Sequence, residues 1–253
     1  MSAADAILST KDLSRRFGGL MANSNVAIEL HRGKVHAVLG PNGAGKTTLI
    51  NLLSGDLRAS SGSIRYKDRD ITRLSPDRRS RIGIGRSYQK TNIFPDFTAF
   101  ENCRLAAQSR APRVLAILAD ALGHEPVCAA ARRALDAAGL AGRAKLVASA
   151  LSHGEQRQLE IAMVLATKPD VLLLDEPLAG MGAEEAARMV ELLKKLASDH
   201  AILLVEHDMD AVFAVADVIT VMVNGQVLES GPPAQIRASP AVRAAYLGED
   251  GEH

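Results

Sequence analysis

The residue types best suited to chemistry in this sequence stand together in one short glycine-rich stretch. It consists of Gly40, Pro41, Asn42, Gly43, Ala44, Gly45, Lys46, Thr47 and Thr48. Their order fits the pattern G-x-x-x-x-G-K-[ST] without a gap. Glycines allow successive backbone N–H groups to turn inward and form a concave nest for an anion. Lys46 supplies positive charge for the β- and γ-phosphates, and the Thr47 hydroxyl can ligate Mg²⁺. The stretch therefore predicts a site for a nucleotide.

Two adjacent carboxylates form a second candidate for chemistry. Asp175 and Glu176 follow the apolar run 171–174, which predicts a buried strand. In phosphate-loop folds Mg²⁺ and its waters lie at the carboxyl end of such a strand, so Asp175 is expected to hold the metal through water. A strand-ending turn would also accommodate an Asp, but two neighbouring carboxylates repel each other and need a cation or a catalytic role. As general base or water orienter, Glu176 would contribute on the order of 10²–10⁴ in rate.

Three further side chains become informative beside a phosphate site. The carbonyl oxygen of Gln89 can complete the Mg²⁺ shell, and His207, which follows the apolar run 201–205, can donate a hydrogen bond to the γ-phosphate. Alone, a glutamine at a strand end means little, and a histidine there is more often a helix-capping or core residue. Phe17 stands beside two glycines. A lone aromatic in that setting is either a loop anchor or a platform for an adenine ring.

The elements that must position these residues alternate between strand and helix. β-Structure is predicted over residues 7–39, and further strands at 63–66, 84–89, 171–174, 201–205, 218–223 and 226–229. Helices are predicted at 48–54, 76–82, 184–197, 233–237 and 240–247. The helix after the phosphate loop directs its N-terminus at the phosphates. Asn224-Gly225 predicts a type I′ hairpin turn. This order is typical of an α/β phosphate-loop fold.

A stretch rich in Ala, Leu and Arg interrupts the alternation between about residue 98 and residue 167. It predicts a helical subdomain inserted into the α/β fold, with one helical run at 129–138. One face of another run is shared by Val114, Leu115, Leu118 and Leu122. A core-facing stripe explains these residues better than a membrane-surface helix, because basic residues are few. Residues from about 231 to 253 are predicted to form a helical tail.

The bulk composition narrows the class of function. The chain has 253 residues, 47% of them hydrophobic, which is enough for one large domain or two small ones with a substantial core. Aromatic residues make up 3% and the net charge is +1, which argues against binding nucleic acid. Cys103 and Cys128 are interpreted as small buried residues in a reducing compartment. The sequence shows no signal peptide and no membrane-spanning run, so we expect a soluble, cytoplasmic protein that can dock on a membrane partner.

The segment 151–160 adds a family resemblance. It reads Leu-Ser-His-Gly-Glu-Gln-Arg-Gln-Leu-Glu and resembles the Leu-Ser-Gly-Gly-Gln signature of the ATP-binding subunits of ATP-binding cassette (ABC) transporters. The phosphate loop, Gln89, the signature, the acidic strand and His207 follow the family's order over nearly the whole chain. The resemblance implies an ATPase that needs ATP and Mg²⁺. It also implies a phosphate-loop core with an antiparallel β-subdomain and an inserted α-helical subdomain. Phe17 matches the family's adenine-stacking aromatic.

The resemblance further implies a head-to-tail dimer with a second ABC ATPase subunit, identical or different. The ATP of one subunit would be contacted by the signature of the other, through Ser152, His153, Gly154 and Glu155. A hydroxyl and a helix N-terminus at the γ-phosphate make closure of the dimer depend on ATP. His153 and Glu155 replace the usual Gly and Gln. Gly182 stands where the family commonly has an Asp that signals between the two sites, which argues against tight coupling of the two hydrolysis events.

A narrower similarity, to importers of branched-chain amino acids or of urea, rests on residues 179–181, 205–209 and 245–249. Such importers are bacterial. The similarity implies two membrane permease subunits, a periplasmic solute-binding protein, and a position on the cytoplasmic face of the inner membrane. The loop after Gln89 is expected to offer a groove for a permease helix, lined by Ile93, Phe94 and Phe97.

Two other functions remain as alternatives. A soluble ABC-type ATPase acting on nucleic acid or ribosomes usually carries long coiled-coil insertions or two cassettes, and neither is seen in this sequence. A scaffold that binds nucleotide without hydrolysing it is disfavoured by Glu176 and His207.

Overall fold

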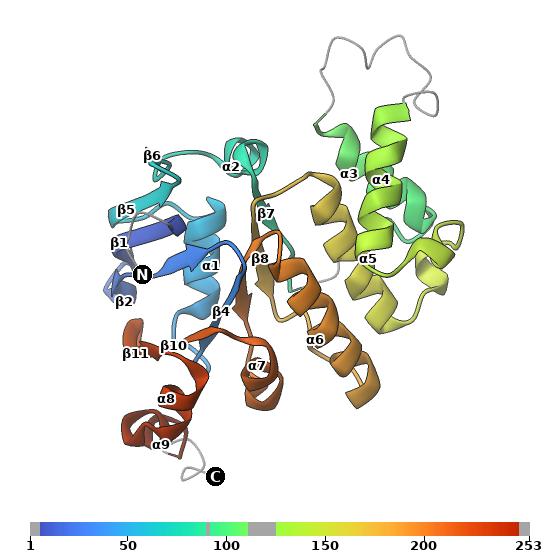
Figure 1. Cartoon of the computed structure of the whole chain (residues 1–253). Helices are drawn as coiled ribbons and strands as arrows, with labels where there is room; N and C mark the ends of the chain where they lie inside the picture. The colour runs from blue at the N-terminus through green and yellow to red at the C-terminus, as the bar shows by residue number, and fades with distance from the viewer. Residues whose placement is uncertain (1–5, 90–91, 111–124, 248–253) are drawn as a thin grey trace.

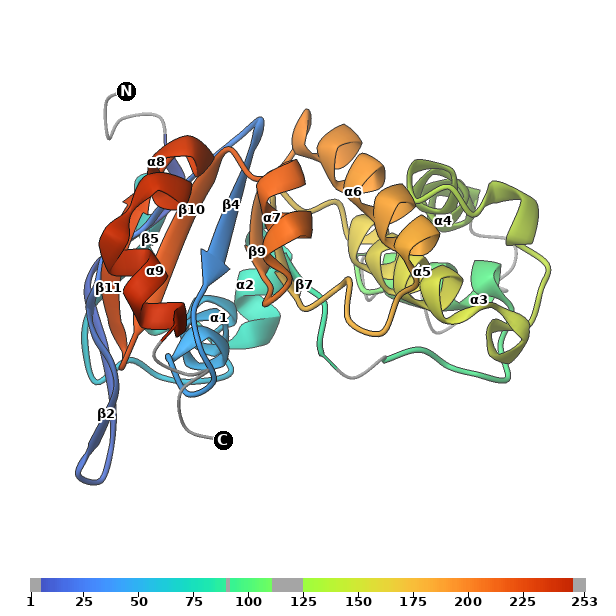
Figure 2. The same ribbon diagram turned by 90° about the horizontal axis from the view of Figure 1, so that it is seen from below.

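The computed structural model describes residues 6–89, 92–110 and 125–247. A mostly parallel sheet lies at the centre, an antiparallel sheet lies on one side of it, and a group of helices stands on the other side (Figure 1). Seen from below, the antiparallel sheet and the C-terminal helices occupy one end of the molecule (Figure 2). The expected α/β phosphate-loop fold with an antiparallel sheet and helices is therefore present.

The central sheet brings the ends of three strands to one edge. In spatial order its strands are β11 (Gln226–Gly231), β10 (Val218–Val223), β4 (Lys34–Leu39), β9 (Ala201–Val205), β8 (Val171–Asp175) and β7 (Ile84–Arg86). Neighbouring strands are parallel except in the β10–β11 hairpin. Val38 of β4 and Asp175 of β8 are both in register with Val205 of β9. The segments that follow these three strands therefore start side by side.

Alternating side chains of the central strands face two separate cores. Leu172 and Leu174 of β8 pack with helix α6 (Ala183–Ala197). Leu173 packs on the other face, with helix α1 (Lys46–Ser54) and the antiparallel sheet. Because successive side chains of a strand point to opposite faces, an uninterrupted apolar run indicates a strand covered on both sides. This is why these runs predicted the central strands well.

The antiparallel sheet packs over the side of the central sheet that carries α1. Its strands in order are β2 (Leu20–Val26), β1 (Ala6–Phe17), β5 (Ser61–Tyr66) and β6 (Arg69–Asp70), and β3 (Glu29–His31) also pairs with β1. The β1–β2 hairpin projects from the body of the molecule (Figure 2). Where β2 passes the phosphate loop, the side-chain amide of Asn23 donates to the Gly45 carbonyl oxygen at 3.2 Å. The hairpin is thereby attached to the loop.

Helices make up most of the described part of the inserted segment. They are α3 (Ala99–Gln108), α4 (Glu125–Ala137) and α5 (His153–Ala166), with short 3₁₀ helices η3 (Ala141–Arg143) and η4 (Ala148–Ala150). The three α-helices pack on one another beside the central sheet (Figure 1). Cys103 and Cys128 are both buried, and burial raises the pKa of the Cys103 thiol to about 12. The apolar stripe predicted between Val114 and Leu122 lies outside the described residues.

Several local predictions are confirmed. Asn224 and Gly225 have φ angles of 48° and 78°, and a type I′ turn needs positive φ at both positions. Helix α2 (Pro76–Ile82) starts at the predicted proline, with Ser75 at the N-cap position. The two closing helices are α8 (Pro233–Ala238) and α9 (Pro240–Leu247), and they lie beside β11 in Figure 2.

One local prediction needs correction, and one helix was not predicted. The strand predicted over 84–89 ends at Arg86, because the carbonyl oxygens of Tyr88 and Gln89 are bonded by the Arg157 guanidinium of α5. Helix α7 (Met209–Val215) was not predicted. Its signal was an aspartate directly before an apolar run, since Asp208 caps the helix by accepting a hydrogen bond from a backbone N–H in the first turn.

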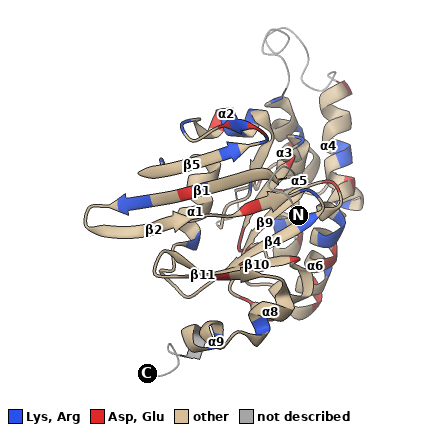
Figure 3. Cartoon of the chain, turned by 60° about the vertical axis from the view of Figure 1, so that its left-hand side comes forward, with Lys and Arg blue, Asp and Glu red and all other residues tan. Residues whose placement is uncertain are grey.

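Within the described part of the chain, no helix is long and apolar enough to cross a membrane. Basic and acidic segments are interspersed over the elements seen in Figure 3.

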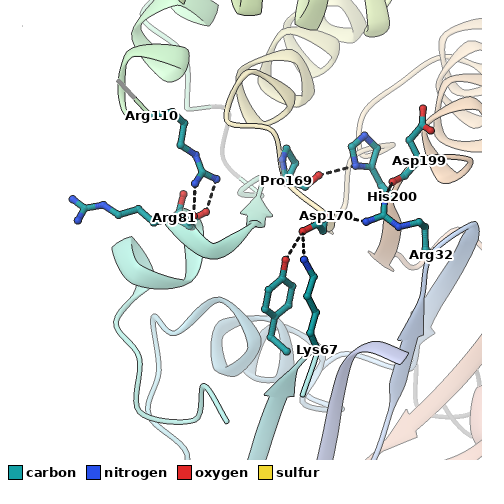
Figure 4. A network of polar contacts seen from close by, with 10 residues as sticks. Arg32, Lys67, Arg81, Arg110, Pro169, Asp170, Asp199 and His200 are labelled. Carbon is teal, nitrogen blue, oxygen red and sulfur yellow. Dashed lines mark hydrogen bonds and ion pairs between the residues drawn. The ribbon is translucent and has the colours of Figure 1, made fainter. Parts of the chain in front are cut away.

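At the amino end of β8, Asp170 ties the two sheets together (Figure 4). Its carboxylate accepts hydrogen bonds from Tyr66 Oη (2.5 Å), Arg32 Nη2 (2.6 Å) and Lys67 Nζ (3.0 Å). Tyr66 belongs to β5, so these bonds join the antiparallel sheet to the central one. Burial alone would raise the pKa of Asp170, but the three donors outweigh it and lower the pKa to about 2. The charge of this carboxylate is fully compensated.

Candidate functional site

The phosphate loop joins β4 to α1 and passes close to two other strands. A Cβ atom at Gly40 would lie 2.2 Å from the Met222 carbonyl oxygen of β10. One at Gly45 would lie 2.4 Å from the Ala22 carbonyl oxygen of β2. Both glycines also have positive φ angles, 154° and 98°. Only glycine fits these two positions, which gives the sequence pattern a structural reason.

Lys46 is buried at the start of α1 and folds back over the loop. Its Nζ donates to the carbonyl oxygens of Gly40 at 2.5 Å and Pro41 at 2.9 Å. Burial raises the pKa of the nearby Asp175 carboxyl, and the positive charge of Lys46 opposes part of that rise. Thr47 follows in the first turn and is exposed. Because the first N–H groups of a helix have no partner inside it, this helix start favours a bound anion.

Asp175 ends β8 and is only 3% exposed. Burial raises the pKa of its carboxyl, while Arg86 lowers it from a distance of 3.5 Å between Nη2 and Oδ2. Arg86 is also held at 2.6 Å from the Asp56 carboxylate and 2.7 Å from the Ser54 hydroxyl. Its guanidinium lies 4.6 Å from the centroid of the Tyr88 ring. Arg86 is thus a part of this site that the sequence patterns did not indicate.

Glu176 brings Gln89 and His207 together at the same edge. Gln89 Nε2 donates to Glu176 Oε2 at 2.7 Å, and His207 Nδ1 lies 3.8 Å from Glu176 Oε1. Because the amide nitrogen of Gln89 donates to Glu176, its side-chain carbonyl oxygen is the atom that could accept a cation. The φ angle of Glu176 is +49°, which is uncommon for a residue other than glycine. Its backbone N–H donates to the Val205 carbonyl oxygen at 2.9 Å, which fixes Glu176 at the end of β9.

Glu206 lies next to His207 and was missed in the sequence. It is completely buried, and its carboxylate accepts hydrogen bonds from the backbone N–H of Leu178 at 2.8 Å and of His207 at 3.3 Å. Burial raises the pKa of Glu206 to about 7 in spite of these bonds. Glu206 therefore links the segment after Glu176 to the segment that carries His207. Its signal was an acid directly after an apolar run, which is also the pattern of Asp175.

The signature begins α5 and forms its own cap. The Ser152 hydroxyl accepts a hydrogen bond from the Glu155 N–H at 3.2 Å, and Glu155 Oε2 accepts one from the Ser152 N–H at 2.9 Å. Glu155 Oε1 also accepts a bond from Arg143 Nε at 2.7 Å. The bond from the Ser152 backbone is the main cause that lowers the pKa of Glu155. The Glu155 carboxylate thus serves the helix start in its own chain.

A carboxylate of the same chain already rests on the signature. Ser152 Oγ donates to Glu185 Oε1 of α6 at 3.0 Å, and a Cβ atom at Gly154 would lie 2.8 Å from the Glu185 carboxylate carbon. Ser152, Gly154 and Glu185 line a cavity of about 630 Å³. Its other lining residues include Arg143, Glu155 and Arg188. His153 is exposed, next to the backbone of Gly180. In Figure 1, α5 and α1 stand on different sides of β7 and β8.

Phe17 lies at the end of β1, opposite Leu20 in the projecting hairpin. It is 42% exposed, and the Arg15 guanidinium lies 4.4 Å from the centroid of its ring. The same hairpin contacts the phosphate loop through Asn23. A flat aromatic surface is therefore carried by the strand pair that borders the loop.

Comparison with known proteins identifies the family. The family model described as ABC transporter matches residues 23–179. The chain is also 39% identical over 252 residues to the high-affinity branched-chain amino acid transport ATP-binding protein LivG of Escherichia coli K12, covering 96% of this chain and 98% of that protein. The chain belongs to the ABC transporter family. The resemblance seen in the signature segment is thereby confirmed.

Two further similarities concern the rest of this ABC protein. It is 39% identical over 251 residues to the high-affinity branched-chain amino acid transport ATP-binding protein BraF of Pseudomonas aeruginosa PAO1, which covers 96% of this chain and 98% of BraF. A model described as branched-chain amino acid ATP-binding cassette transporter matches residues 226–252.

Solved structures support the same family assignment. A nucleotide-free ATP-binding cassette from an ABC transporter is 27% identical, with a TM-score of 0.84, and the match covers 95% of this chain and 98% of that one. The ADP conformation of an ATP-binding cassette is 27% identical, with a TM-score of 0.83, covering 96% and 99%. This ABC protein binds nucleotide and is an ATPase that couples ATP hydrolysis to transport.

Proposed function

We propose that this ABC protein is the motor subunit of a bacterial importer of branched-chain amino acids. The observation that carries the proposal is the 39% identity with LivG over 96% of the chain. The match at residues 226–252 supports it separately, because it lies beyond residues 23–179, which the general ABC transporter model covers. A transporter for urea is the alternative.

In the proposed site the phosphate loop, residues 40–48, holds the triphosphate of ATP, and Phe17 stacks on the adenine. Mg²⁺ would be held by the Thr47 hydroxyl, the Gln89 carbonyl oxygen and, through water, Asp175. The donors fit this ion, because Mg²⁺ is usually bound by one or two carboxylates together with phosphate oxygens and waters. The burial of Asp175 also fits, since a cation stabilises a carboxylate that burial alone disfavours. When bound, the ion would neutralise charge on the β- and γ-phosphates.

Hydrolysis is assigned to the edge where Glu176 and His207 meet. Glu176 accepts the proton of the attacking water, and Gln89 Nε2 orients its carboxylate from 2.7 Å. His207, with a side chain 62% exposed, donates to the γ-phosphate. Glu206 keeps the backbone of both segments in place through its two hydrogen bonds.

A second ABC ATPase subunit completes the site in this proposal. The signature residues Ser152, His153, Gly154 and Glu155 face the partner's ATP across a head-to-tail dimer. The γ-phosphate then replaces the Glu185 carboxylate, which now accepts the Ser152 hydroxyl. This exchange of one anion for another at a helix N-terminus would make dimer closure depend on ATP. Hydrolysis would reopen the dimer.

The proposed membrane partners are two permease subunits on the cytoplasmic face of the inner membrane, served by a periplasmic solute-binding protein. Phe94 and Phe97 are 50% and 41% exposed, and their ring centroids lie 5.5 Å apart. Val147, 40% exposed, is bridged to the neighbouring Thr98. An exposed apolar patch of this kind suits a docking helix. We assign residues 98–167 as the subdomain that moves with the permease, and 231–253 as a tail.

Uptake measurements test the proposed solute. A strain that lacks this chain, supplied with the wild-type chain or with Glu176→Gln, is assayed with labelled leucine and with labelled urea. We expect leucine uptake to be restored only by the wild type, and urea uptake to be unaffected. Restored urea uptake with unchanged leucine uptake would favour the alternative solute, and recovery of the chain with nucleic acid instead of membrane subunits would reject the importer.

A further inference from the structure

A buried ion pair on α5 stands one to two turns after the signature. Arg157 Nη1 lies 3.0 Å from Glu160 Oε2, and their side chains are only 8% and 6% exposed. Removing two charges from water is costly, and a buried pair often stabilises a fold no better than apolar residues of the same size. Its position therefore needs an explanation other than stability.

The pair holds the backbone of the loop that carries Gln89. Arg157 Nη2 donates to the backbone carbonyl oxygen of Gln89 at 2.6 Å, and Nη1 donates to the backbone carbonyl oxygen of Tyr88 at 3.2 Å. Glu160 Oε1 accepts a hydrogen bond from the Asn92 N–H at 3.0 Å. A planar guanidinium can bond two successive carbonyl oxygens at once, whereas a lysine ammonium at the end of a flexible chain is a point charge. The geometry thus depends on arginine.

The backbone contact fixes the origin of the Gln89 side chain, and that side chain reaches Glu176. Two hydrogen bonds therefore connect α5 to the proposed general base through Gln89: one from Arg157 to its backbone carbonyl oxygen, and one from its side-chain amide to Glu176 at 2.7 Å. The same helix starts at Ser152. A movement of α5 would displace the Gln89 amide from Glu176.

We propose that Arg157 and Glu160 are positioning residues that set where the Gln89 amide meets Glu176 and the metal. The inference rests on the proposed role of Gln89 in the Mg²⁺ shell. It goes beyond that role by assigning control of Gln89 to the signature helix. A purely structural pair would fasten α5 to the core with no specific dependence on the Gln89 side chain.

A double-mutant cycle separates the two roles. Mn²⁺ binding to the full-length chain with a non-hydrolysable ATP analogue is measured by EPR for wild type, Gln89→Ala, Arg157→Lys and the combination. We expect each single substitution to weaken Mn²⁺ binding about 10-fold, the usual effect of disturbing a residue that orients a ligand. The combination should be no weaker than Gln89→Ala alone, because Arg157 acts through that side chain.

Two further variants control for folding and for charge. Arg157→Gln with Glu160→Gln removes both charges together, so that no unpaired ion is buried, and it should behave like Arg157→Lys. Arg132→Gln changes an arginine of an exposed ion pair on α4 and should bind Mn²⁺ as the wild type does. Wild-type Mn²⁺ affinity in Arg157→Lys, or losses that multiply in the combination, would overturn the inference.

A second readout distinguishes failure of the inference from failure of the assigned metal shell. If Gln89→Ala binds Mn²⁺ normally, Gln89 is not a metal ligand, and that part of the proposed function is wrong. The kcat for ATP hydrolysis is then measured for the same four proteins, because this rate depends on the contact between Gln89 and Glu176. Non-additive losses in kcat support the positioning role, and additive losses reject it.

Discussion

The two ends of β8 carry aspartates in opposite electrostatic situations. Asp170 at the amino end accepts bonds from a tyrosine, a lysine and an arginine, and its pKa falls to about 2. Asp175 at the carboxyl end is more deeply buried, and its pKa is raised. Arg86 and Lys46 compensate its charge only in part, and Glu176 adds a like charge next to it. At one end of β8 the charge of the carboxylate is compensated by its neighbours, and at the other end it is compensated only in part.

The difference teaches where function lies on this fold. A carboxylate surrounded by donors, such as Asp170, joins elements and gains little from any further cation. Carboxyls whose ionisation is disfavoured by burial and by the nearby charge of Glu176, as with Asp175 and Glu206, are suited to hold a metal or a proton. We therefore propose that the amino end of β8 maintains the fold, while the carboxyl end takes part in the chemistry.

The largest expected effect is on the chemical step at the carboxyl end. Glu176→Gln removes the proposed base and keeps the shape of the side chain. We expect ATP hydrolysis in a single turnover to fall by on the order of 10²–10⁴, with ATP binding retained. Bound ATP and released phosphate are measured on the same sample, with Glu184→Gln, which changes an exposed side chain of α6, as the control. Unchanged turnover in Glu176→Gln would show that another group activates the water.

Each aspartate has an arginine partner, and the two partners should differ in their effect on stability. Arg86 is 8% exposed in its pair with Asp175, whereas Arg32 is 50% exposed in its pair with Asp170. Breaking a buried pair leaves an uncompensated charge, so Arg86→Gln should lower the free energy of unfolding by about 3 kcal/mol. Arg32→Gln should lower it by less than about 1 kcal/mol. Urea unfolding measures both, and equal losses would contradict the contrast between the two ends.

The stability contributed by carboxyls at the two ends of the parallel strands should also depend on pH with opposite sign. The groups concerned are Asp170 before β8 and Glu206 after β9. The folded pKa of Asp170, about 2, lies below its ordinary 3.8, so its stabilisation is present above pH 3.8 and is lost as the pH falls toward 2. The folded pKa of Glu206, about 7, lies above its ordinary 4.5, so stability is full below pH 4.5 and declines as the pH rises through 7. The decline should amount to about 3 kcal/mol.

Unfolding free energies of Glu206→Gln and Asp170→Asn over this pH range test the assignment. Glu206→Gln should abolish the decline toward neutral pH, since an amide does not ionise. Asp170→Asn should flatten only the acid limb, by about 1 kcal/mol because the carboxylate is partly exposed to solvent. A decline toward neutral pH that persists in Glu206→Gln would assign it to another group.

Much of the carboxyl edge could be predicted from the sequence, because its features are local. The phosphate loop is one continuous pattern, and Asp175, Glu176 and His207 lie within two residues of the ends of apolar runs that are buried on both faces. Parallel register then brings these positions together without further information. Glu206 follows the same rule, because it comes directly after the buried run 201–205.

The remaining parts could not be predicted because they depend on contacts between distant segments. Arg157 meets the carbonyl of Gln89, 68 residues away in sequence, and Asp170 meets Arg32 across 138 residues. Neither arginine differs in pattern from the many surface arginines of the chain. The strand predicted over 84–89 failed for the same reason, since a side chain from α5 took over its carbonyl groups.

The division of labour along β8 is tested most directly by Asp170→Asn and Asp175→Asn measured in parallel, for the free energy of unfolding and for single-turnover ATP hydrolysis. Asp170→Asn should lower the free energy of unfolding by about 1–2 kcal/mol and leave hydrolysis within about twofold of the wild type. Asp175→Asn should leave stability unchanged or higher, because it removes a carboxylate whose ionisation burial disfavours while Arg86 keeps its pair with Asp56. It should reduce hydrolysis about 10²-fold. Normal hydrolysis in Asp175→Asn, or loss of hydrolysis in a stable Asp170→Asn, would contradict the account.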